Sequence, residues 1–388
     1  MIGIIIAGTL FFATVTLGCV FFRNSDNSST GDYERSSRVN PAIQNSFYPS
    51  PQLRPPVVSD NLLNIVSKIF VISLPRRIDR RIQMDLLKDT LRLDWTYRNA
   101  CEANAPIVTT ILHQNQGEVI VSVFDWPRDL DNMIYSQAML QPFGADLWTL
   151  PSSHGLPDLA AHAELAPATL DLPPLACATG NDISAPFSPD LPLHRHLTAA
   201  KVACWYSHSQ IIREIANSKH EAVLVLEDDV DMERDIGRRL QALWSALPSD
   251  WDIVYLGHCW SSESRFTPLR SVILHLPGGH TAQSVLHPAN APKCTHAYVL
   301  SRIGARRIVA HLSHPPFAYS RAIDQALAWL VQSGRLRAFS IVPPVVVQRK
   351  IDSSDVMPGL GSAWRNKLYD GVFGGFDFDK KPKPKRTS

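Results

Sequence analysis

Short apolar runs alternate with helix-like stretches through most of the chain after residue 67. Runs rich in β-branched residues predict buried strands at residues 69–74, 222–226, 252–256, 297–300 and 339–347. Apolar residues at helical spacing predict helices after residue 77 and at residues 198–215, 236–247, 301–312 and 322–331. This alternation predicts an α/β fold with a mainly parallel central sheet.

Local signals add detail to three of these helices. The helix after the first strand is expected to be amphipathic, because four apolar residues recur at helical spacing: Ile78, Ile82, Leu86 and Leu87. Thr198 and Ser301 each precede a predicted helix. Their hydroxyl oxygens are expected to accept hydrogen bonds from the free N–H groups of the first turn.

The two ends of the chain differ from this region. Residues 1–22 carry no charge, and such a helix spans about 30 Å, so they predict an uncleaved transmembrane anchor. If this segment were instead a cleaved signal, the protein would be secreted. A polar, Ser/Pro-rich stem is expected at residues 23–66, the folded domain at 67–370 and a basic disordered tail at 371–388.

A long, Pro-rich insertion is expected inside the domain, at about residues 101–196. Its second half contains Pro173, Pro174, Pro186, Pro189 and Pro192, which make helical periodicity hard to sustain. The insertion is either an acceptor-binding lid or a tolerated surface loop.

Composition limits the partners and the chemistry. The formal net charge is +2 over 388 residues, so no general field points to nucleic acid. The six cysteines form no C-x-x-C pair, which argues against a thiolate zinc site. In a lumenal setting one or two disulfides could form, and buried unpaired cysteines are the alternative.

The sharpest local feature is an acidic triplet, Glu227, Asp228 and Asp229, directly after the strand at 222–226. Ligands of α/β sheets bind beyond the carboxyl ends of the strands. Mg²⁺ or Mn²⁺ takes carboxylate oxygens together with substrate phosphates, so the triplet predicts a metal that neutralises a leaving diphosphate. If the strand continued, Glu227 and Asp229 would share a face and Asp228 would turn away. A solvated acidic loop, a metal-dependent phosphohydrolase or a phosphoreceiver pocket fits the same pattern.

A second candidate site follows the first strand, where Arg76 and Arg80 stand one helical turn apart. Guanidinium groups and helix N-terminal amides suit phosphate, and solvated arginines on an exposed helix are the alternative. Ser207 and His208 are adjacent in a predicted helix, so their side chains diverge by about 100° and do not suit a catalytic pair. A polar contact to a nucleotide or loop and ordinary helix packing both fit them.

Seven segments in this order resemble glycosyltransferase family 25, which contains lipopolysaccharide and procollagen galactosyltransferases. They are residues 69–81 (IFVISLPRRIDRR), 197–215, 222–230 (AVLVLEDDV), 252–257 (DIVYLG), 295–308, 322–327 (AIDQAL) and 345–356. The resemblance implies a GT-A-like nucleotide-sugar-binding fold. It also implies a UDP-sugar donor, often UDP-galactose, a divalent metal such as Mn²⁺, and inversion at the anomeric carbon.

The resemblance implies roles for single residues. The acidic triplet Glu227, Asp228 and Asp229 would take the metal and diphosphate. Residues expected near the nucleotide are Leu74, Arg76, Asp79 and Arg80, with Ser207 and His208 from the later helix. An inverting transfer needs a carboxylate to accept the acceptor hydroxyl proton. Asp324 is the candidate base, and Asp355 is a weaker candidate.

The resulting expectation is a metal-assisted, inverting glycosyltransferase with a lumenal catalytic domain, anchored in the Golgi or endoplasmic reticulum membrane. Its acceptor would be a glycan, glycolipid or glycoprotein. Two positions depart from the family pattern: Ser73 stands where the family has asparagine, and Lys201 stands where it has an acidic residue. A catalytically inactive, sugar- or nucleotide-binding relative is therefore an alternative.

Overall fold

The computed structural model describes residues 65–117, 175–179, 185–186, 188, 190–275, 281–314, 317–349, 356 and 368–373. The predicted anchor at residues 1–22, nearly all of the stem, most of the insertion, Asp355 and the tail beyond residue 373 lie outside the described residues. Within the described ranges, no helix combines the length and the apolar character needed to cross a membrane.

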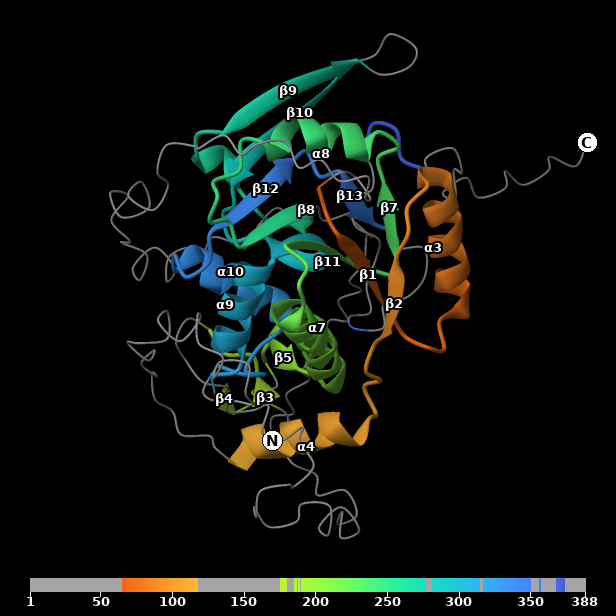
Figure 1. Ribbon diagram of the computed structural model, residues 1–388. Helices are drawn as coiled ribbons and strands as arrows, with labels where there is room; N and C mark the ends of the chain where they lie inside the picture. The colour runs from red at the N-terminus through yellow and green to blue at the C-terminus, as the bar shows by residue number, and fades with distance from the viewer. Residues whose placement is uncertain are drawn as a thin grey trace, which may run out of the picture. The chain divides into compact units, whose positions relative to one another are not determined.

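An eight-stranded sheet forms the centre of the described structure, in the order β2-β1-β6-β11-β8-β12-β10-β9 (Figure 1). Its strands are β1 (Lys68–Ser73), β2 (Thr96–Asn99), β6 (Ala222–Glu227), β8 (Ile253–Cys259), β9 (Arg270–His275), β10 (Thr281–Pro288), β11 (Lys293–Ser301) and β12 (Ala338–Val342). The predicted α/β class is confirmed.

The sheet is mixed, whereas the sequence predicted a mainly parallel one. β1 pairs in parallel with β2 and β6, and β12 pairs in parallel with β8. β11 runs antiparallel between β6 and β8, and β10 runs antiparallel between β12 and β9. The β9–β10 hairpin escaped prediction because it lies at an edge of the sheet and alternates exposed with buried residues instead of forming an apolar run.

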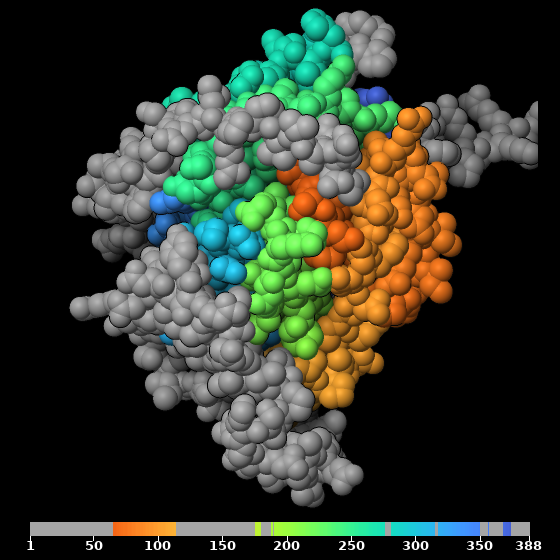
Figure 2. All heavy atoms as spheres, viewed as in Figure 1, coloured from red at the N-terminus to blue at the C-terminus, as the bar shows by residue number. Residues whose placement is uncertain are grey.

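Helices cover both faces of the sheet. One core packs α4 (Pro106–Gly117), α7 (Ala199–Asn217), α9 (Arg302–Leu312) and α10 (Ile323–Gln332) against one face. The other core packs α3 (Ile78–Leu91) and α8 (Ile236–Trp244) against the opposite face. Val223 and Val225 of β6 face the first core, and Leu224 and Leu226 face the second, as strand alternation requires. In the space-filling view, yellow-green α7 lies between the orange N-terminal part and the cyan helices (Figure 2).

Short elements complete the described structure. β7 (Val230–Met232) pairs with β13 (Val346–Gln348) in a two-stranded sheet. β4 (Ala185–Pro186), β3 (Leu175–Ala176) and β5 (His196–Leu197) form a three-stranded sheet near the end of the predicted insertion. Single 3₁₀ turns occur at η4 (Leu193–Arg195) and η5 (Glu263–Arg265).

Both predicted helix caps are present. The Thr198 hydroxyl accepts a hydrogen bond from the Lys201 N–H at 3.3 Å, and the Ser301 hydroxyl accepts one from the Gly304 N–H at 2.9 Å. Each cap satisfies a donor that has no partner within its own helix. The caps therefore fix where α7 and α9 begin.

Helix α3 buries a different face from the one its apolar spacing suggested. Ile78 and Ile82 are each 64% exposed, and Leu86 is 52% exposed. Met84 and Leu87, three residues apart, are fully buried against the sheet. The periodicity identified the helix but not the side that packs.

The apolar run predicted as one strand at residues 339–347 is divided between two sheets. Pro343 and Pro344 stand between β12 and β13. Proline has no N–H to donate to a strand ladder, so the first pairing ends there. The chain then turns to pair with β7, and this brings Gln348 beside the acidic triplet.

A short segment near the C-terminus is bound to β7 and to the residue that follows it. The buried carboxylate of Glu233 accepts hydrogen bonds from the N–H groups of Tyr369 at 2.6 Å and Asp370 at 2.8 Å. The Val372 N–H donates to the Met232 carbonyl at 3.1 Å. Residues 371–373, which were predicted to belong to the tail, therefore have partners in the folded part.

Candidate functional site

The carboxyl ends of β1, β6 and β8 lie along one edge of the sheet. Because β11 is antiparallel to β6 and β8, its first residues lie at that same edge. The edge therefore gathers the acidic triplet after β6, Thr295 from β11 and Cys259 from β8. It is the edge at which ligands of α/β sheets usually bind.

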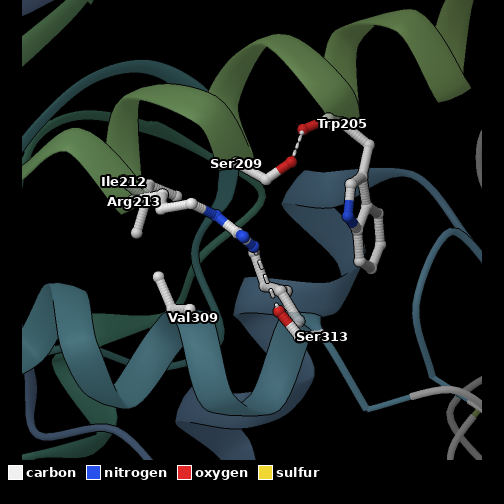
Figure 3. Close-up of a pocket in the computed structure, with 7 residues that line it drawn as sticks. Trp205, Ser209, Ile212, Arg213, Val309 and Ser313 are labelled. Carbon is white, nitrogen blue, oxygen red and sulfur yellow. Dashed lines mark hydrogen bonds between the residues drawn. The ribbon is translucent and has the colours of Figure 1, made fainter. Parts of the chain in front are cut away.

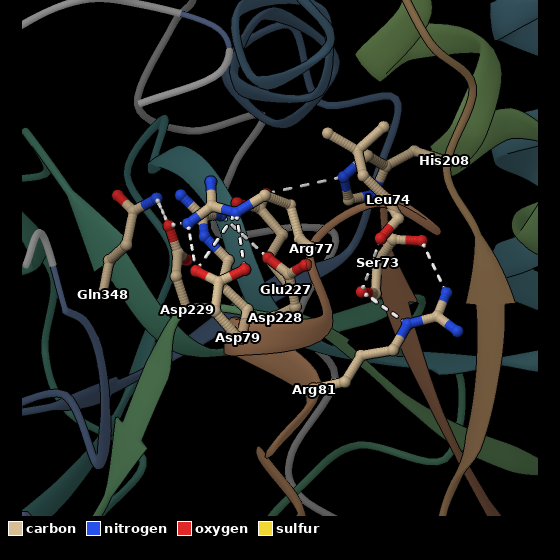
Figure 4. Close-up of polar contacts among 11 residues, drawn as sticks. Ser73, Leu74, Arg77, Asp79, Arg81, His208, Glu227, Asp228, Asp229 and Gln348 are labelled. Atoms are coloured by element: carbon tan, nitrogen blue, oxygen red, sulfur yellow. Dashed lines mark hydrogen bonds and ion pairs between the residues drawn. The ribbon is translucent and has the colours of Figure 1, made fainter. Parts of the chain in front are cut away.

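Asp228 and Asp229 share one arginine on the α3 side. Arg80 Nη1 lies 2.8 Å from Asp228 Oδ1 and 3.3 Å from Asp229 Oδ2. Gln348 Nε2 donates to Asp229 Oδ2 at 3.0 Å (Figure 4). β6 ends at Glu227 and a turn follows, so strand alternation does not extend through the triplet. Both aspartates consequently meet the same guanidinium group, although alternation would have separated them.

The electrostatics of Asp229 suit a cation. Burial raises the pKa of Asp229 to about 7, and the charges of Glu227 and Asp228 add to the rise while Arg80 and Gln348 oppose it. Asp229 is 9% exposed, and its Oδ1 has no hydrogen-bond partner in the part of the chain that the structure describes. A buried carboxylate oxygen without a donor is costly. A divalent cation with oxygen ligands would satisfy it.

The triplet does not form a closed three-carboxylate cage. Over the described ranges, a single set of three potential ligand atoms lies within 4.8 Å of one another: those of Cys259, Cys294 and His296. The two sulfurs in that set are joined in a disulfide. The carboxylate arrangement suits a metal that takes one or two protein oxygens and completes its coordination with phosphate oxygens, as Mg²⁺ and similar ions do.

Glu227 belongs to a different set of contacts. The Thr295 hydroxyl donates to Glu227 Oε1 at 2.8 Å, and His208 Nε2 lies 3.5 Å from the same oxygen. Burial alone would raise the pKa of Glu227, but His208, His296 and Thr295 together hold that pKa below its usual value. His208 Nδ1 is hydrogen-bonded to the Tyr298 hydroxyl at 2.9 Å, which fixes the imidazole against Glu227.

Asp324 lies in the first turn of α10, where the helix dipole favours a carboxylate. Its Oδ1 accepts from the Gln325 N–H at 2.8 Å, and its Oδ2 accepts from the Cys294 N–H at 3.4 Å. Burial raises the pKa of the Cys204 thiol, and the charges of both Glu227 and Asp324 raise it further. The consecutive residues Cys294 and Thr295 of β11 contact Asp324 and Glu227 respectively, so the candidate base shares this edge with Glu227.

Several residues expected near a nucleotide make separate contacts. Arg76 pairs with Glu102 at 3.5 Å in an exposed ion pair, so it does not converge with Arg80. Arg77 binds Asp79 at 2.8 Å, and this hydrogen bond lowers the pKa of Asp79 to about 2. Leu74 is partly buried and directly follows β1.

Among the described residues, Ser207 makes its hydrogen bonds with backbone groups and not with the acidic triplet. Its hydroxyl donates to the Ala203 carbonyl at 2.7 Å and accepts from the Cys101 N–H at 2.8 Å. It lines a cleft of about 520 Å³ between the end of β2 and α7. A second gap, between Trp205 and Val309, is too small for a water molecule (Figure 3). The residues that line these two spaces include no member of the acidic triplet.

The two departures from the family pattern have defined structural partners. The Ser73 hydroxyl accepts from Arg81 Nε at 3.0 Å. Lys201 is 3% exposed, and its ammonium donates to the carbonyl oxygens of His194 at 2.8 Å and His196 at 2.6 Å. Burial lowers the pKa of Lys201, and the charges of Cys177 and Asp324 oppose this. Lys201 therefore holds η4 and β5 onto α7.

Sequence reasoning missed four contributors to this edge: Thr295, Gln348, Cys204 and the Cys259–Cys294 disulfide. The disulfide was among the options that the cysteine count left open, but spacing does not reveal which cysteines pair. Thr295 and Cys204 lie inside segments that resemble the family, at positions where the pattern alone assigns no contact. Gln348 depends on the turn at Pro343 and Pro344.

Comparisons with known proteins agree with these segments. Residues 181–325 match the sequence model described as glycosyltransferase family 25 (LPS biosynthesis protein). The chain is 34% identical over 122 residues to procollagen galactosyltransferase 1 of Danio rerio, covering 30% of this chain and 18% of the fish protein. The resemblance to family 25 is therefore confirmed.

Other relatives carry a different description. The chain is 33% identical over 119 residues to a protein of Bos taurus named probable inactive glycosyltransferase 25 family member 3, covering 30% of this chain and 18% of that protein. It is 43% identical over 70 residues to procollagen galactosyltransferase 1-B of Xenopus laevis, covering 17% of this chain and 12% of that protein. The matched part spans less than a fifth of these relatives' length.

Proposed function

Because residues 181–325 carry the pattern of glycosyltransferase family 25, we propose that this chain is a UDP-sugar-dependent glycosyltransferase. The donor sugar is galactose, by analogy with the names of the procollagen galactosyltransferases. The acceptor is a glycan, glycolipid or glycoprotein, and the catalytic domain is lumenal and membrane-anchored. The single observation that carries the proposal is the sheet edge, where Asp228 and Asp229 lie beside Arg80 and Asp324 shares the edge with Glu227.

A metal held by Asp228 and Asp229 would neutralise the charge that develops on a leaving diphosphate. Mn²⁺ is the ion we favour, and Asp229 Oδ1, which has no hydrogen-bond partner among the described residues, is the atom that most needs it. Arg80 provides a cation beside both aspartates, so it would hold a phosphate oxygen as well. Glu227, with Thr295 and His208 as its partners, would complete the polar edge next to the metal.

Asp324 is the residue we assign to the acceptor. Both of its oxygens are oriented by backbone N–H groups, which leaves lone pairs free to accept the proton of an acceptor hydroxyl. Attack on the face of the anomeric carbon opposite the diphosphate would invert the configuration. The proton would move to Asp324 as the new glycosidic bond forms and the bond to the diphosphate breaks.

A turnover assay tests the proposal. The chain from about residue 60 onward, incubated with UDP-galactose and Mn²⁺, should release UDP, and chelation should stop the release. A panel of UDP-sugars then identifies the donor. No UDP release from any donor, with or without metal and acceptors, would remove the assignment.

A catalytically inactive relative is the second candidate. It is favoured by the relatives named inactive and by Lys201, which stands where the family has an acidic residue. Metal-independent UDP binding without turnover, measured by isothermal titration calorimetry beside the turnover assay, would support this candidate against the first.

A further inference from the structure

Trp260 is an exposed aromatic residue at the edge of the sheet that carries the acidic groups. It directly follows Cys259, the last residue of β8, and is 75% exposed. Its φ of 52° lies in the left-handed region, which bulky residues rarely adopt. Non-glycine residues held in that region concentrate at binding and catalytic sites.

The backbone on both sides of Trp260 is fixed. Cys259 is joined by a disulfide to Cys294, with their Cα atoms 5.6 Å apart. On the other side, Ser261 Oγ lies 2.7 Å from the Asn290 carbonyl oxygen and 2.5 Å from Oε1 of buried Glu263. The indole is therefore held in solvent by a constrained turn, unlike a side chain on a mobile loop.

The disulfide places this turn on the Asp324 side of the site. The Cys294 N–H donates to Asp324 Oδ2 at 3.4 Å, and the next residue, Thr295, donates to Glu227 at 2.8 Å. Trp260 is therefore next to Cys259, which is covalently bonded to Cys294. The Cys294 N–H in turn orients the candidate base, Asp324. Arg80, which contacts Asp228 and Asp229, approaches from α3 at the other end of the triplet.

We infer that Trp260 is the platform on which a pyranose ring of the acceptor glycan stacks; this inference rests on the proposed function. A pyranose presents an apolar face of C–H groups, and the electron-rich face of indole attracts such partially positive hydrogens. Stacking buries that face and leaves the hydroxyl groups at the ring's rim free. One hydroxyl can then meet Asp324 while the others stay hydrated.

Tyr369 is also an exposed aromatic residue, but its ring already lies against the Arg239 guanidinium group, 5.6 Å from ring centroid to Cζ, in the segment bound to Glu233. The aliphatic side chains that are exposed do not offer an aromatic face. Ile78, Ile82 and Leu86 are aliphatic and lie on α3, and Ile273 lies on β9 in the hairpin at the edge of the sheet. Ile273 is 66% exposed, close to the exposure of Trp260. It is therefore a matched control for the loss of an exposed apolar side chain.

The test compares Trp260→Ala, Trp260→Phe, Trp260→Leu and Ile273→Ala with the wild type. The probes are the methyl glycosides of galactose, glucose and mannose. Their binding is measured by saturation-transfer NMR in the presence of UDP and Mn²⁺, and their use as acceptors by steady-state kinetics with UDP-galactose. The thermal midpoint of each variant checks folding, and calorimetric UDP affinity checks the donor side.

We expect Trp260→Ala and Trp260→Leu to raise the Kd and KM for the best glycoside about tenfold, equal to ~1.4 kcal/mol. Trp260→Phe should stay within about threefold of the wild type because it retains an aromatic face. Ile273→Ala should match the wild type, and UDP affinity should not change in any of the four variants.

Three results would overturn the inference: equal glycoside binding by Trp260→Ala and the wild type, full retention in Trp260→Leu, or a wild type that binds none of the glycosides. Failure of the proposed function is separate. It appears as the absence of UDP-sugar turnover. The NMR comparison of glycoside binding by the wild type and the Trp260 variants still tests the stacking role.

Discussion

The two sides of the sheet edge hold their carboxylates in different ways. On the Arg80 side, Asp228 and Asp229 form ion pairs with Arg80 of α3, and Asp229 also accepts a hydrogen bond from Gln348 of β13. On the Asp324 side, Asp324 is held by backbone N–H groups, and Glu227 is held by Thr295 and His208. The first side carries a formal cation, and the second is built from dipoles and an imidazole.

This difference suggests that the Arg80 side binds the metal and diphosphate and that the Asp324 side binds the acceptor hydroxyl. Side-chain cations pair with phosphates and can rearrange when a diphosphate enters, since long side chains have rotamer freedom. Backbone donors do not move, so they suit a carboxylate that must meet one hydroxyl in a fixed geometry. Substitutions on the Arg80 side should therefore alter metal and UDP dependence. Substitutions on the Asp324 side should alter kcat or the acceptor.

The largest effect is expected for Asp229→Ala. The variant should lose at least about a hundredfold in kcat, because a metal that neutralises the leaving diphosphate contributes several kcal/mol. Turnover and Mn²⁺ titrations measure the loss, and circular dichroism checks the fold. Asp94→Ala is the control, because its carboxylate is exposed and contacts Lys88. Wild-type rates in Asp229→Ala would break the assignment of this side to the metal.

Asp324→Asn should follow, with kcat lowered by about 10²–10³. The amide keeps an oxygen for the Gln325 N–H but no longer accepts a proton readily. UDP affinity, measured by calorimetry, should remain at the wild-type value. Equal losses in kcat and UDP affinity would mean that Asp324 supports the structure of both sides, and the division proposed here would be wrong.

Thr295→Val should have a moderate effect, lowering kcat about fivefold for the loss of one hydrogen bond worth ~1 kcal/mol. Valine retains the shape of threonine but lacks the hydroxyl that donates to Glu227. Thr295→Ser keeps the hydroxyl and serves as the control. If Thr295→Val instead raises the Mn²⁺ concentration needed for half-maximal rate, Glu227 belongs with the metal ligands.

The sequence predicted the elements of this edge better than their contacts. Apolar runs located β6, β8 and β11, because buried strands leave a local pattern that a single chain shows. The acidic triplet was identifiable because it follows such a run. The turn at Asp228 and Asp229 was not, since the expected alternation assumed a strand that in fact ends at Glu227.

Contacts between distant segments explain most of what remained unpredicted. Arg80 meets residues about 150 positions away, whereas Arg76, four residues earlier, pairs with Glu102. Arg76 stands in the turn before α3, which begins only at Ile78, so the helical spacing that would have aligned it with Arg80 does not apply. Likewise, the disulfide joins cysteines that are 35 residues apart in sequence, and their pairing depends on β11 lying beside β8.

Lys201→Met should give the smallest kinetic effect and a clear loss of stability. Methionine fills similar space, but the carbonyls of His194 and His196 lose their donor, which costs about 1–3 kcal/mol of unfolding free energy. Denaturant unfolding measures this loss. The control Lys88→Met removes a partly exposed ion pair and should cost less than about 1 kcal/mol.

We expect kcat of Lys201→Met to stay within about twofold of the wild type, because the ammonium is directed at two backbone oxygens. A large fall in kcat without a loss of stability would show that Lys201 acts on Asp324, whose charge it senses. The departure from the family pattern would then bear on catalysis and not on how η4 and β5 are held.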